Sequence, residues 1–433
     1  MTIELTNPAL LRTEAYINGE WIAADSGARL PVTNPATGEL ITDVAKAGAD
    51  ETKRAIEAAE TAMVTWRQQP AKQRAQVMRR WFDLIMANQE DLARIMTLEQ
   101  GKTLAESRGE VAYGASYIEW FAEQAKRIDG DVIPAPSGDK RIICIKQPVG
   151  VCASITPWNF PNAMITRKAA PALAAGCTIV IKPASETPLS ALALAELAHQ
   201  AGIPPGVLNV LAGSSSDIGG ELTSNPIVRK LSFTGSTPVG KMLEADCVPT
   251  LKKTSMELGG NAPFIVFDDA DIDSAVQGAL ISKYRNSGQT CVCSNRMLIQ
   301  ASVAEEFTAK LVAATQSLTL GNGLEAGVDL GPLVNAKAVV DVHELVQQSI
   351  AAGAKLALGG APSERGGCFY QPTILTDITP DMAVFRNEIF GPVAPIMTFE
   401  TEAEAIELAN DTEFGLASYF YTRDIGRIWR VAE

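Results

Sequence analysis

From residue 150 onward, short apolar strands alternate with helices, and this rhythm restricts the possible folds of the 433-residue chain more than any other feature. Predicted strands at 178–181, 207–211, 229–233 and 254–257 are separated by helical segments and by turns that carry glycine or proline. Strands that are joined through helices run parallel, because each crossover helix returns the chain to the end of the sheet at which the previous strand began. Residues 150–256 therefore predict a parallel, doubly wound sheet.

A second alternation of strands and helices begins near Asn261, with the run Pro-Phe-Ile-Val-Phe. It continues through a predicted helix at 272–284 and predicted strands at 296–299 and 394–399. The sequence is thus expected to form two doubly wound, Rossmann-like α/β domains, the second of them at 257–433.

The first 130 residues are predicted to be mostly helical, with apolar residues at three- and four-residue spacing in 53–66, 71–100 and 105–127. We assign 1–128 to the same domain as 150–256. Between these two parts, 129–149 holds Val-Ile-Pro, a Pro-Ser-Gly-Asp turn and the apolar run Arg-Ile-Ile-Cys-Ile-Lys. This pattern predicts an exposed β-hairpin that needs a partner to cover it.

The composition excludes several classes of function. Acidic side chains outnumber basic ones by 50 to 37, and the net charge of −13 argues against nucleic acid or an acidic membrane surface as a partner. No run reaches the roughly 18 apolar residues that span a bilayer. The cysteines number seven and lack framework spacing, and the first 11 residues do not resemble a signal peptide, so we expect a reducing cytoplasm. The only histidines, His199 and His343, stand far apart, which argues against a metal site.

The run Gly-Gln-Thr-Cys-Val-Cys-Ser at 288–294 places two cysteines one residue apart in a turn of small and polar residues. Core thiols rarely have such neighbours, so Cys291 is a candidate nucleophile. The alternative is that Cys291 and Cys293 are both inert, small apolar side chains.

Two further motifs follow predicted strands and are suited to anions. Phe-Thr-Gly-Ser-Thr-Pro-Val-Gly at 233–240 leads from a strand into a helix, whose free amides attract phosphate, although such a turn can be purely structural. Ile-Lys-Pro-Ala-Ser at 181–185 ends a parallel strand, where ligands of such sheets bind. Lys182 there can contact a ribose or a phosphate, or it can be a solvated strand-end lysine.

Two other motifs supply catalytic side-chain types. Met-Glu-Leu-Gly-Gly-Asn at 256–261 places Glu257 at the predicted boundary between the domains, where it can act as a general base through water or be an ordinary terminal charge. Pro-Trp-Asn-Phe-Pro at 157–161 fixes a turn around Asn159, whose amide can bind an oxyanion or simply stabilise the turn.

Taken together with Glu-Ile-Phe-Gly-Pro at 388–392, and in this order and spacing, these motifs resemble the aldehyde dehydrogenase superfamily. The resemblance runs from about Ile17-Asn18-Gly19 to the final residue. Within the superfamily, Trp-Asn-Phe-Pro-x-Ala-Met-Ile-Thr-Arg-Lys and Arg-Asn-x-Gly-Gln-Thr-Cys-Val-Cys are similar to the succinate-semialdehyde dehydrogenase branch, especially its bacterial members.

The resemblance implies oxidation of succinate semialdehyde to succinate through covalent catalysis. By similarity, the Cys291 thiolate attacks the aldehyde, and the Asn159 amide and the Cys291 backbone N–H hold the oxyanion. Hydride passes to a nicotinamide, and Glu257 activates the water that hydrolyses the thioester. The resemblance also makes 1–128 with 150–256 the dinucleotide-binding domain, 257–433 the catalytic domain and 129–149 an oligomerisation hairpin.

The resemblance further implies which residues bind the dinucleotide. These are Trp158, Lys182, Ser185, Gly235, Ser236 and Glu388. A carboxylate at position 185 would repel a 2′-phosphate, whereas Ser185 beside Lys182 leaves room and charge for one. We therefore expect NADP as the cofactor, with NAD also usable, although the nearby Glu186 weakens this preference.

For the substrate, the resemblance implies that Arg167 and Arg285 clamp the distal carboxylate, a role that suits the guanidinium fork. The arginine pair cannot separate substrates that differ by one methylene, so glutarate semialdehyde and other aliphatic aldehydes remain alternatives. Cys293 is similar to a redox partner that forms a disulfide with Cys291 and inactivates the enzyme.

The sequence also departs from the family pattern. The Pro-Phe-Gly-Gly loop and the terminal strand that normally follow are not present, and the apolar stripe of 423–433 ends without a cap. The C-terminal end of the catalytic domain is therefore expected to be missing. This leaves homo-oligomer formation in doubt, and it keeps open a truncated, cofactor-binding fragment with little turnover.

Overall fold

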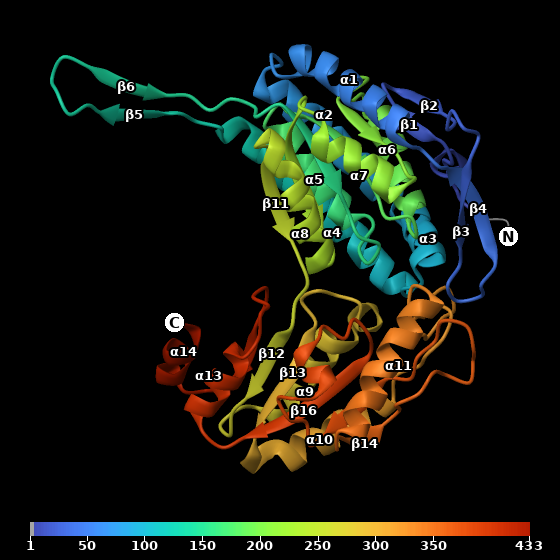
Figure 1. Cartoon of the computed structure of the whole chain (residues 1–433), viewed down its shortest axis with the longest axis vertical. Coiled ribbons are helices and arrows are strands. Elements are labelled where there is room, and N and C mark those ends of the chain that lie inside the picture. Colours follow the sequence, from blue (N-terminus) through green and yellow to red (C-terminus); the bar gives the residue numbers. More distant parts are fainter. Residues whose placement is uncertain (1–3) are drawn as a thin grey trace. The chain divides into compact units, whose positions relative to one another are not determined.

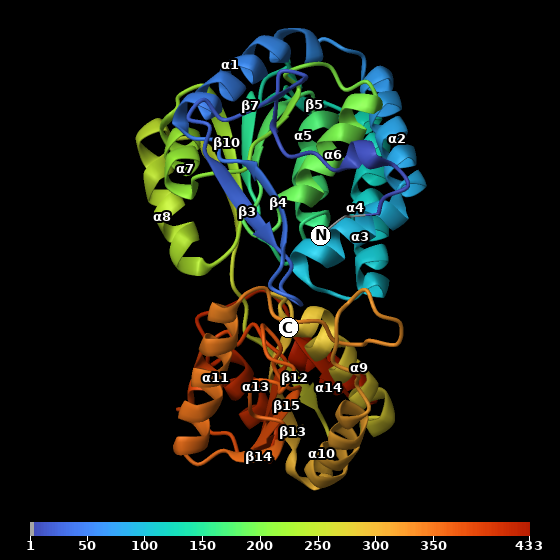
Figure 2. The ribbon, with the colours of Figure 1, turned by 90° about the vertical axis from the view of Figure 1, so that its right-hand side faces the viewer.

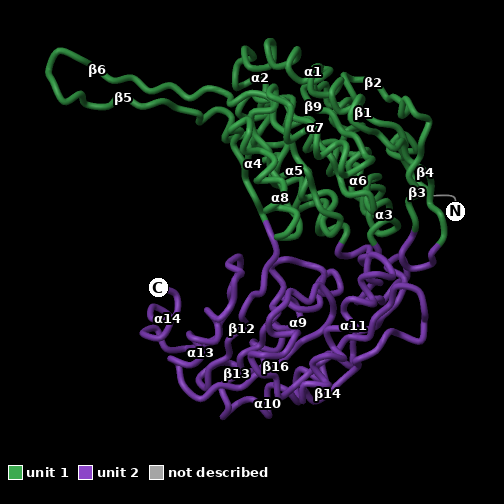
Figure 3. Tube along the Cα trace, in the orientation of Figure 1, with its two compact units in different colours: residues 1–33, 39–100, 107–257 green, residues 34–38, 101–106, 258–433 purple. Residues whose placement is uncertain are grey.

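The computed structural model describes residues 4–433, which divide into two compact units (Figure 3). Of the described residues, unit 1 takes those up to Thr33, Glu39–Gln100 and Ser107–Glu257, and unit 2 takes Asn34–Gly38, Gly101–Glu106 and Leu258–Glu433. Each unit is a layered α/β structure around a largely parallel sheet (Figure 1). The predicted fold class is therefore confirmed.

The sheet of unit 1 has the strand order β11-β10-β7-β8-β9-β1-β2. Its parallel strands are β7 (Val151–Ile155), β8 (Thr178–Lys182), β9 (Leu208–Val210), β10 (Val228–Thr234) and β11 (Lys253–Glu257). The edge strands β1 (Ala15–Ile17) and β2 (Glu20–Ile22) run antiparallel. Since β7 and β8 are buried along almost their whole length, both faces of this sheet must be covered.

Helices cover both faces of this sheet, as Figure 2 shows. The α-helices are α1 (Ala49–Trp66), α2 (Ala71–Ala87), α3 (Gln89–Gln100), α4 (Leu104–Gln124), α5 (Ala163–Ala174), α6 (Pro188–Gln200), α7 (Ser215–Ser224) and α8 (Thr237–Cys247). Short 3-10 turns are η1 (Pro8–Leu10), η2 (Ala125–Arg127) and η3 (Val248–Thr250). Helices α5 and α6 pack on one face, with α2 against them, whereas α1, α7 and α8 lie on the other.

Two expectations for the first 130 residues are wrong. The single helix predicted at 71–100 is α2 followed by α3, because the side-chain amide of Asn88 donates to the carbonyl of Leu84 at 2.8 Å and ends α2. Strands also occupy part of the region that was predicted to be mostly helical. Besides β1 and β2, β3 (Arg29–Thr33) and β4 (Leu40–Ala45) form an antiparallel pair. Strands of three to six residues are too short to show a clear period of two.

The hairpin predicted at 129–149 forms from β5 (Asp131–Pro134) and β6 (Arg141–Cys144). It projects as a long arm from the rest of unit 1 in Figure 1. Apolar side chains along this arm face solvent, with Val132 73%, Ile143 71% and Ile145 70% exposed. Exposed apolar surface of this extent is typical of interaction sites.

The sheet of unit 2 has the strand order β14-β15-β16-β13-β12-β17. Its strands are β12 (Ala262–Val266), β13 (Ser294–Gln300), β14 (Lys355–Leu358), β15 (Thr373–Thr376), β16 (Val393–Phe399) and β17 (Tyr419–Tyr421). All are parallel to their neighbours except β14, which pairs antiparallel with β15. The edge strand β17 brings residues near 420 beside β12.

Side chains of β12 alternate between two cores, as a strand that is buried on both faces requires. Phe264 and Val266 pack with residues of α9 (Ile272–Tyr284) and α10 (Ala301–Gln316). Ile265 packs on the other face, with residues of α11 (Ala336–Ala351) and α13 (Glu402–Asn410). The helix predicted at 272–284 coincides with α9. The remaining elements are η4 (Arg285–Gly288), α12 (Ala383–Arg386) and α14 (Ile425–Ala432).

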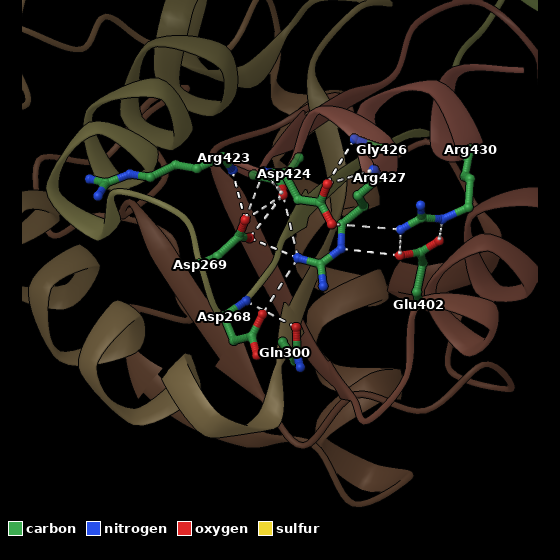
Figure 4. A network of polar contacts seen from close by, with 10 residues as sticks. Asp268, Asp269, Gln300, Glu402, Arg423, Asp424, Gly426, Arg427 and Arg430 are labelled. Carbon is green, nitrogen blue, oxygen red and sulfur yellow. Dashed lines mark hydrogen bonds and ion pairs between the residues drawn. The ribbon is translucent and has the colours of Figure 1, made fainter.

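Ionic contacts connect helix α14 to the rest of unit 2 (Figure 4). Arg427 donates to Asp269 at 2.7 Å and to Glu402 at 3.1 Å, and its guanidinium lies 4.4 Å from the ring of Phe267. Arg430 donates to Glu402 at 2.6 Å and 2.9 Å. Within residues 4–433, none of the helices combines the length and the apolar character needed to cross a bilayer.

Candidate active site

The predicted site residues of unit 1 gather at one edge of its sheet. Strands β11, β10, β7 and β8 are neighbours and parallel, so their carboxyl ends lie side by side. Glu257 ends β11, Gly235 follows β10, Asn159 lies shortly after β7, and Lys182 ends β8. Ligands of doubly wound sheets bind outside these carboxyl ends. The fold therefore places four separate motifs on one ligand-binding edge.

Gly235 and Ser236 connect β10 to α8. The Gly235 N–H donates to the carbonyl of Glu257 at 3.0 Å and so continues the pairing of β10 with β11. A Cβ at position 235 would lie 2.5 Å from the ring of Phe233, so only glycine fits there. Ser236 is the N-cap of α8, with Pro238 in the first turn, and the free amides at this helix terminus can bind an anion.

Lys182 is buried at the end of β8, and its ammonium donates to the carbonyl of Pro183 at 3.2 Å. Burial lowers the pKa of Lys182 below its ordinary value, and the carboxylate of Glu186 opposes this effect. Ser185 is half-buried, whereas Glu186 is exposed. A buried ammonium, a hydroxyl and the amides of α8 form a donor set whose chemistry suits a phosphorylated ligand.

The turn after β7 carries Trp158, which is half-buried, and Asn159, which is buried. The Thr156 N–H donates to the carbonyl of Lys182 at 3.1 Å, so the turn starts in register with the end of β8. Arg167 follows on α5 and is half-buried; its guanidinium donates to the hydroxyls of two tyrosines on α4, Tyr113 and Tyr117.

Glu257 is exposed at the end of β11, and the buried Lys168 lies near it. The Lys168 ammonium donates to the hydroxyl of Ser232 at 2.9 Å. Burial lowers the pKa of Lys168 to about 8, against the attraction of Glu257. Lys168 was not among the predicted site residues, although a lysine within the apolar helix α5 is a signal that could have identified it.

The predicted site residues of unit 2 depend on a strained turn between α9 and β13. Asn286, Ser287 and Gly288 have φ of 52°, 54° and 76°, in the left-handed region that non-glycine residues rarely adopt. Hydrogen bonds hold this turn. The Asn286 N–H donates to Glu106 at 2.6 Å, and the Ser287 hydroxyl donates to the carbonyl of Gly331 at 2.8 Å. The turn thus leads rigidly into Thr290 and Cys291.

Cys291 is half-buried, and its backbone carbonyl lies close to Gly260, just before β12. A Cβ on Gly260 would lie 2.1 Å from the carbonyl oxygen of Cys291, so glycine is required there. On the other side, the hydroxyl of Tyr419 in β17 donates to the carbonyl of Val292 at 2.7 Å. Burial raises the pKa of Tyr419, and the nearby Cys293 and Cys291 thiols add to the effect.

Cys293 occupies a different environment from Cys291. It is buried, and its thiol donates to the carbonyl of Lys283 at 3.1 Å. Burial raises the pKa of the Cys293 thiol, and the ammonium of the fully buried Lys283 opposes this effect. A thiol with a raised pKa is a weak nucleophile. Of the two cysteines, Cys291 is therefore the better candidate nucleophile.

Glu388 and Arg285 are the other predicted site residues of unit 2. Glu388 accepts the N–H of Gly260 at 3.0 Å, beside the segment that packs on Cys291. Burial raises the pKa of Glu388 to about 7, against the effects of the Gly260 N–H and of Lys283. Arg285 is exposed at the start of the turn, and its charge influences Tyr419.

Each unit therefore holds part of the predicted site. In unit 1 the structure brings together Trp158, Asn159, Arg167, Lys182, Ser185, Gly235, Ser236 and Glu257 around one end of the sheet. In unit 2 it brings together Cys291, Cys293, Arg285 and Glu388 around one turn. Tyr419 was missed because it is 127 residues from its partner Val292 and has no local signal.

Comparisons with known proteins agree on the relationship of this chain. The model of the aldehyde dehydrogenase family matches residues 21–433. Glutarate-semialdehyde dehydrogenase of Pseudomonas aeruginosa is 62% identical over 431 residues, which are 100% of this chain and 89% of that protein. Succinate-semialdehyde dehydrogenase [NADP(+)] of Escherichia coli is 58% identical with the same coverage. The crystal structure of succinate-semialdehyde dehydrogenase from Burkholderia pseudomallei superposes with a TM-score of 0.99 and 59% identity, over 99% of this chain and 89% of that one.

Proposed function

Because this chain belongs to the aldehyde dehydrogenase family, we propose that it oxidises succinate semialdehyde to succinate with NADP as the hydride acceptor, and that NAD can replace NADP. The observation that carries this proposal is the half-buried thiol of Cys291 at the end of a rigid, left-handed turn. A thiol that is held in place and reachable is what covalent catalysis on an aldehyde needs. An NAD(P)-dependent aldehyde dehydrogenase is the enzyme class that uses it.

We assign catalytic roles to three residues. The Cys291 sulfur forms a bond to the aldehyde carbon, and the carbonyl oxygen becomes an oxyanion that the Asn159 amide and the Cys291 N–H stabilise. After loss of hydride the carbon is a thioester. Glu257 then takes a proton from water, whose oxygen attacks the thioester, and the Cys291 thiolate leaves as succinate forms. The ammonium of Lys168 lies near Glu257 and attracts its carboxylate electrostatically.

The donor set of unit 1 fits NADP. Lys182, Ser185, Ser236 and the amides of α8 would hold phosphates and ribose hydroxyls, with Trp158 and Gly235 beside them. The ribose of the nicotinamide half would be bound by Glu388. Position 185 is a serine, so no carboxylate there repels a 2′-phosphate. When it is bound, the nicotinamide supplies the acceptor for the hydride of the substrate.

Arg167 and Arg285 are proposed to bind the distal carboxylate of the substrate. A chain with a net charge of −13 needs local guanidinium groups to attract an anionic aldehyde. Glutarate semialdehyde is the second candidate substrate, because the 62% identical relative from Pseudomonas aeruginosa carries that name. One methylene changes binding by only about 1–3 kcal/mol, so both semialdehydes are expected to react.

Steady-state kinetics test this function. The chain should reduce NADP with succinate semialdehyde and with glutarate semialdehyde, and it should react at least tenfold less efficiently with butanal, which has no carboxylate. NAD should support a lower rate than NADP. Cys291→Ala should abolish activity, whereas Cys368→Ala, a change at another half-buried cysteine of unit 2, should not. Equal efficiency with butanal would contradict the carboxylate clamp, and no turnover at all would contradict the enzyme assignment.

We further propose that the chain forms homo-oligomers through the arm β5–β6. The exposed side chains of Val132, Ile143 and Ile145 support this, because a hairpin edge with apolar residues is suited to pairing with another chain. Ile143→Lys should reduce the mass measured by light scattering, whereas the matched change Val64→Lys, on the exposed face of α1, should leave it unchanged. An unaltered mass for Ile143→Lys would contradict the proposal.

Two further proposals concern the location of the chain and the redox chemistry of its cysteines. A cytoplasmic location agrees with the state of the cysteines, since all seven are free thiols. Cys293 is proposed as a redox partner of Cys291. Because its thiol is buried and bonded to Lys283, formation of that disulfide requires the loop of 291–293 to rearrange. Peroxide should inactivate the native chain, and a dithiol should then restore its activity. In Cys293→Ser, the dithiol should not restore activity.

A further inference from the structure

Arg167 of α5 contacts two tyrosines of α4, neither of which was predicted as a site residue. Its Nη2 donates to the hydroxyls of both Tyr113 and Tyr117. The guanidinium carbon lies 4.9 Å from the ring of Tyr117 and 5.7 Å from that of Tyr113. The two rings meet edge to face with centroids 5.1 Å apart, and their hydroxyl oxygens are 2.6 Å apart. The three side chains therefore form one compact polar cluster.

The cluster rests on two helices that are pinned to each other. Glu110 of α4 accepts the backbone N–H groups of Asn162 at 2.9 Å and Ala163 at 3.2 Å, at the start of α5. A Cβ on Gly114 would lie 2.3 Å from the side-chain oxygen of Asn162, so glycine permits the close approach of α4. Positions 110, 113, 114 and 117 share one face of a helix. The same face that fixes α4 against α5 therefore presents the two tyrosines to Arg167.

Counting donors and acceptors shows what the cluster can bind. Both N–H groups of Nη2 go to phenol oxygens, and one phenol donates its proton to the other. The second phenol must direct its own proton outside the three side chains, because a guanidinium accepts no hydrogen bond. Phenols also orient a guanidinium without neutralising its charge, which a carboxylate partner would do. An oriented positive charge beside a hydroxyl donor suits the oxygens of an anion.

We propose that Tyr113 and Tyr117 are positioning residues that hold Arg167 as a receptor for the distal carboxylate of the aldehyde, and that they determine the preference for anionic substrates. This inference rests on the proposed function, since it presumes an aldehyde dehydrogenase that accepts a semialdehyde. The tyrosine contacts fix the orientation of the Arg167 guanidinium. Its central carbon lies over both rings, and both hydroxyls accept hydrogen bonds from its Nη2.

Tyr117→Phe isolates the hydroxyl, because it keeps the ring and its cation–π contact and removes the acceptor. The value of kcat/KM should fall about tenfold more for succinate semialdehyde than for butanal, mainly through KM. Tyr113→Phe should act in the same direction. In the double variant, the decrease in log(kcat/KM) should not exceed the sum of the decreases in the two single variants. Tyr16→Phe is the matched control. Tyr16 lies on β1 and its hydroxyl is 3.1 Å from Nδ1 of His199 on α6, so this change should alter kcat/KM for both substrates by the same factor.

Two ratios keep this inference separate from the proposed function. The ratio of semialdehyde to butanal efficiency in the native chain reports the function, and the change of that ratio in Tyr117→Phe reports the role of the tyrosines. A preserved ratio in Tyr117→Phe, with or without a general loss of activity, would overturn the inference while leaving the function intact. Absence of a preference in the native chain would overturn both this inference and the proposed carboxylate clamp, whereas only absence of turnover would contradict the enzyme assignment. Butanal turnover and a native circular dichroism spectrum show that the variant folds.

Discussion

Tyr419→Phe is expected to weaken catalysis without touching a reacting atom. The hydroxyl of Tyr419 donates to the carbonyl of Val292, the residue between Cys291 and Cys293, at 2.7 Å. Removing it leaves the ring packed near Phe264, at a centroid distance of 6.3 Å, so the perturbation is confined to one hydrogen bond. The loop that carries Cys291 then loses this hydrogen bond to β17.

The size of the effect follows from the nature of this bond. A neutral hydrogen bond contributes a net amount of about 0.5–1.5 kcal/mol, and water can replace part of it at the exposed Val292. The population of the competent loop conformer should therefore fall relative to other conformers by about 2- to 13-fold, since 1.36 kcal/mol corresponds to tenfold. This factor limits the loss in kcat/KM. The strained turn before Cys291 keeps its other hydrogen bonds, so the loss should not approach that of Cys291→Ala.

The assay compares kcat/KM for succinate semialdehyde and butanal, together with the rate of Cys291 alkylation by iodoacetamide. All three should fall by a similar factor, because the loop holds the nucleophile and not the substrate carboxylate. Tyr421→Phe is the matched control, since its ring also packs on Phe264, at 5.3 Å, whereas its hydroxyl lies against Gly278 of α9. Equal losses in Tyr419→Phe and Tyr421→Phe, or alkylation at the native rate in Tyr419→Phe, would refute the reasoning.

Two further predictions concern the general base and the last helix. Glu257→Gln should keep a burst of about one reduced cofactor per active site and slow the following steady state by about 10²- to 10⁴-fold, as stopped-flow absorbance can show; loss of the burst would contradict its role in hydrolysis. At α14, the guanidinium of Arg430, followed by that of Arg427, lowers the pKa of Glu402 from 4.5 to about 2. A lowered folded-state pKa means that the contribution of Glu402 to stability is present above pH 4.5 and is lost as the pH falls through 2. Hydrogen exchange of α14 amides, corrected for the intrinsic rate, should therefore show protection at pH 5 that disappears near pH 2, and Glu402→Gln should weaken it already at pH 7. Protection that does not depend on pH would disprove the ionic attachment.

The sequence predicted those parts of the fold that leave a long, regular pattern. Strand β8 is buried along its whole length, and the repeated alternation of short strands with helices predicted β8, β10, β11 and helix α9 to within a residue or two. The break at Asn88 was not predictable from periodicity, because both helices bury apolar residues at the same spacing across it. The short strands β1 to β4 obtain their stability from pairing with distant residues, as β1 does with β9. Such pairing has no local signature.

In the candidate site too, some residues are placed by their neighbours in the sequence, and others are oriented by residues far away in the chain. Residues with catalytic chemistry stand in short motifs, because strand ends and tight turns fix them locally, as at Gly235 and at the turn of 286–288. The side chains that orient these residues come from elsewhere in the chain. Tyr117 is 50 residues from Arg167, and Tyr419 is 127 residues from Val292. A motif can therefore identify the reaction, while the contacts that tune it appear only in the folded chain.

This division has a consequence for substrate preference among related enzymes. Relatives that share 58–62% identity with this chain carry the names of both succinate- and glutarate-semialdehyde dehydrogenases. The proposed catalytic residues, Cys291 and Glu257, would perform the same chemistry on any aldehyde, so they would not separate these substrates. Semialdehydes differ from uncharged aldehydes such as butanal in the distal anion, so a preference between these two classes must arise where that anion binds. In this chain that anion is expected to meet Arg167, whose orientation depends on hydroxyls contributed by α4. Changes on one face of α4 can therefore shift substrate preference while every catalytic motif stays the same.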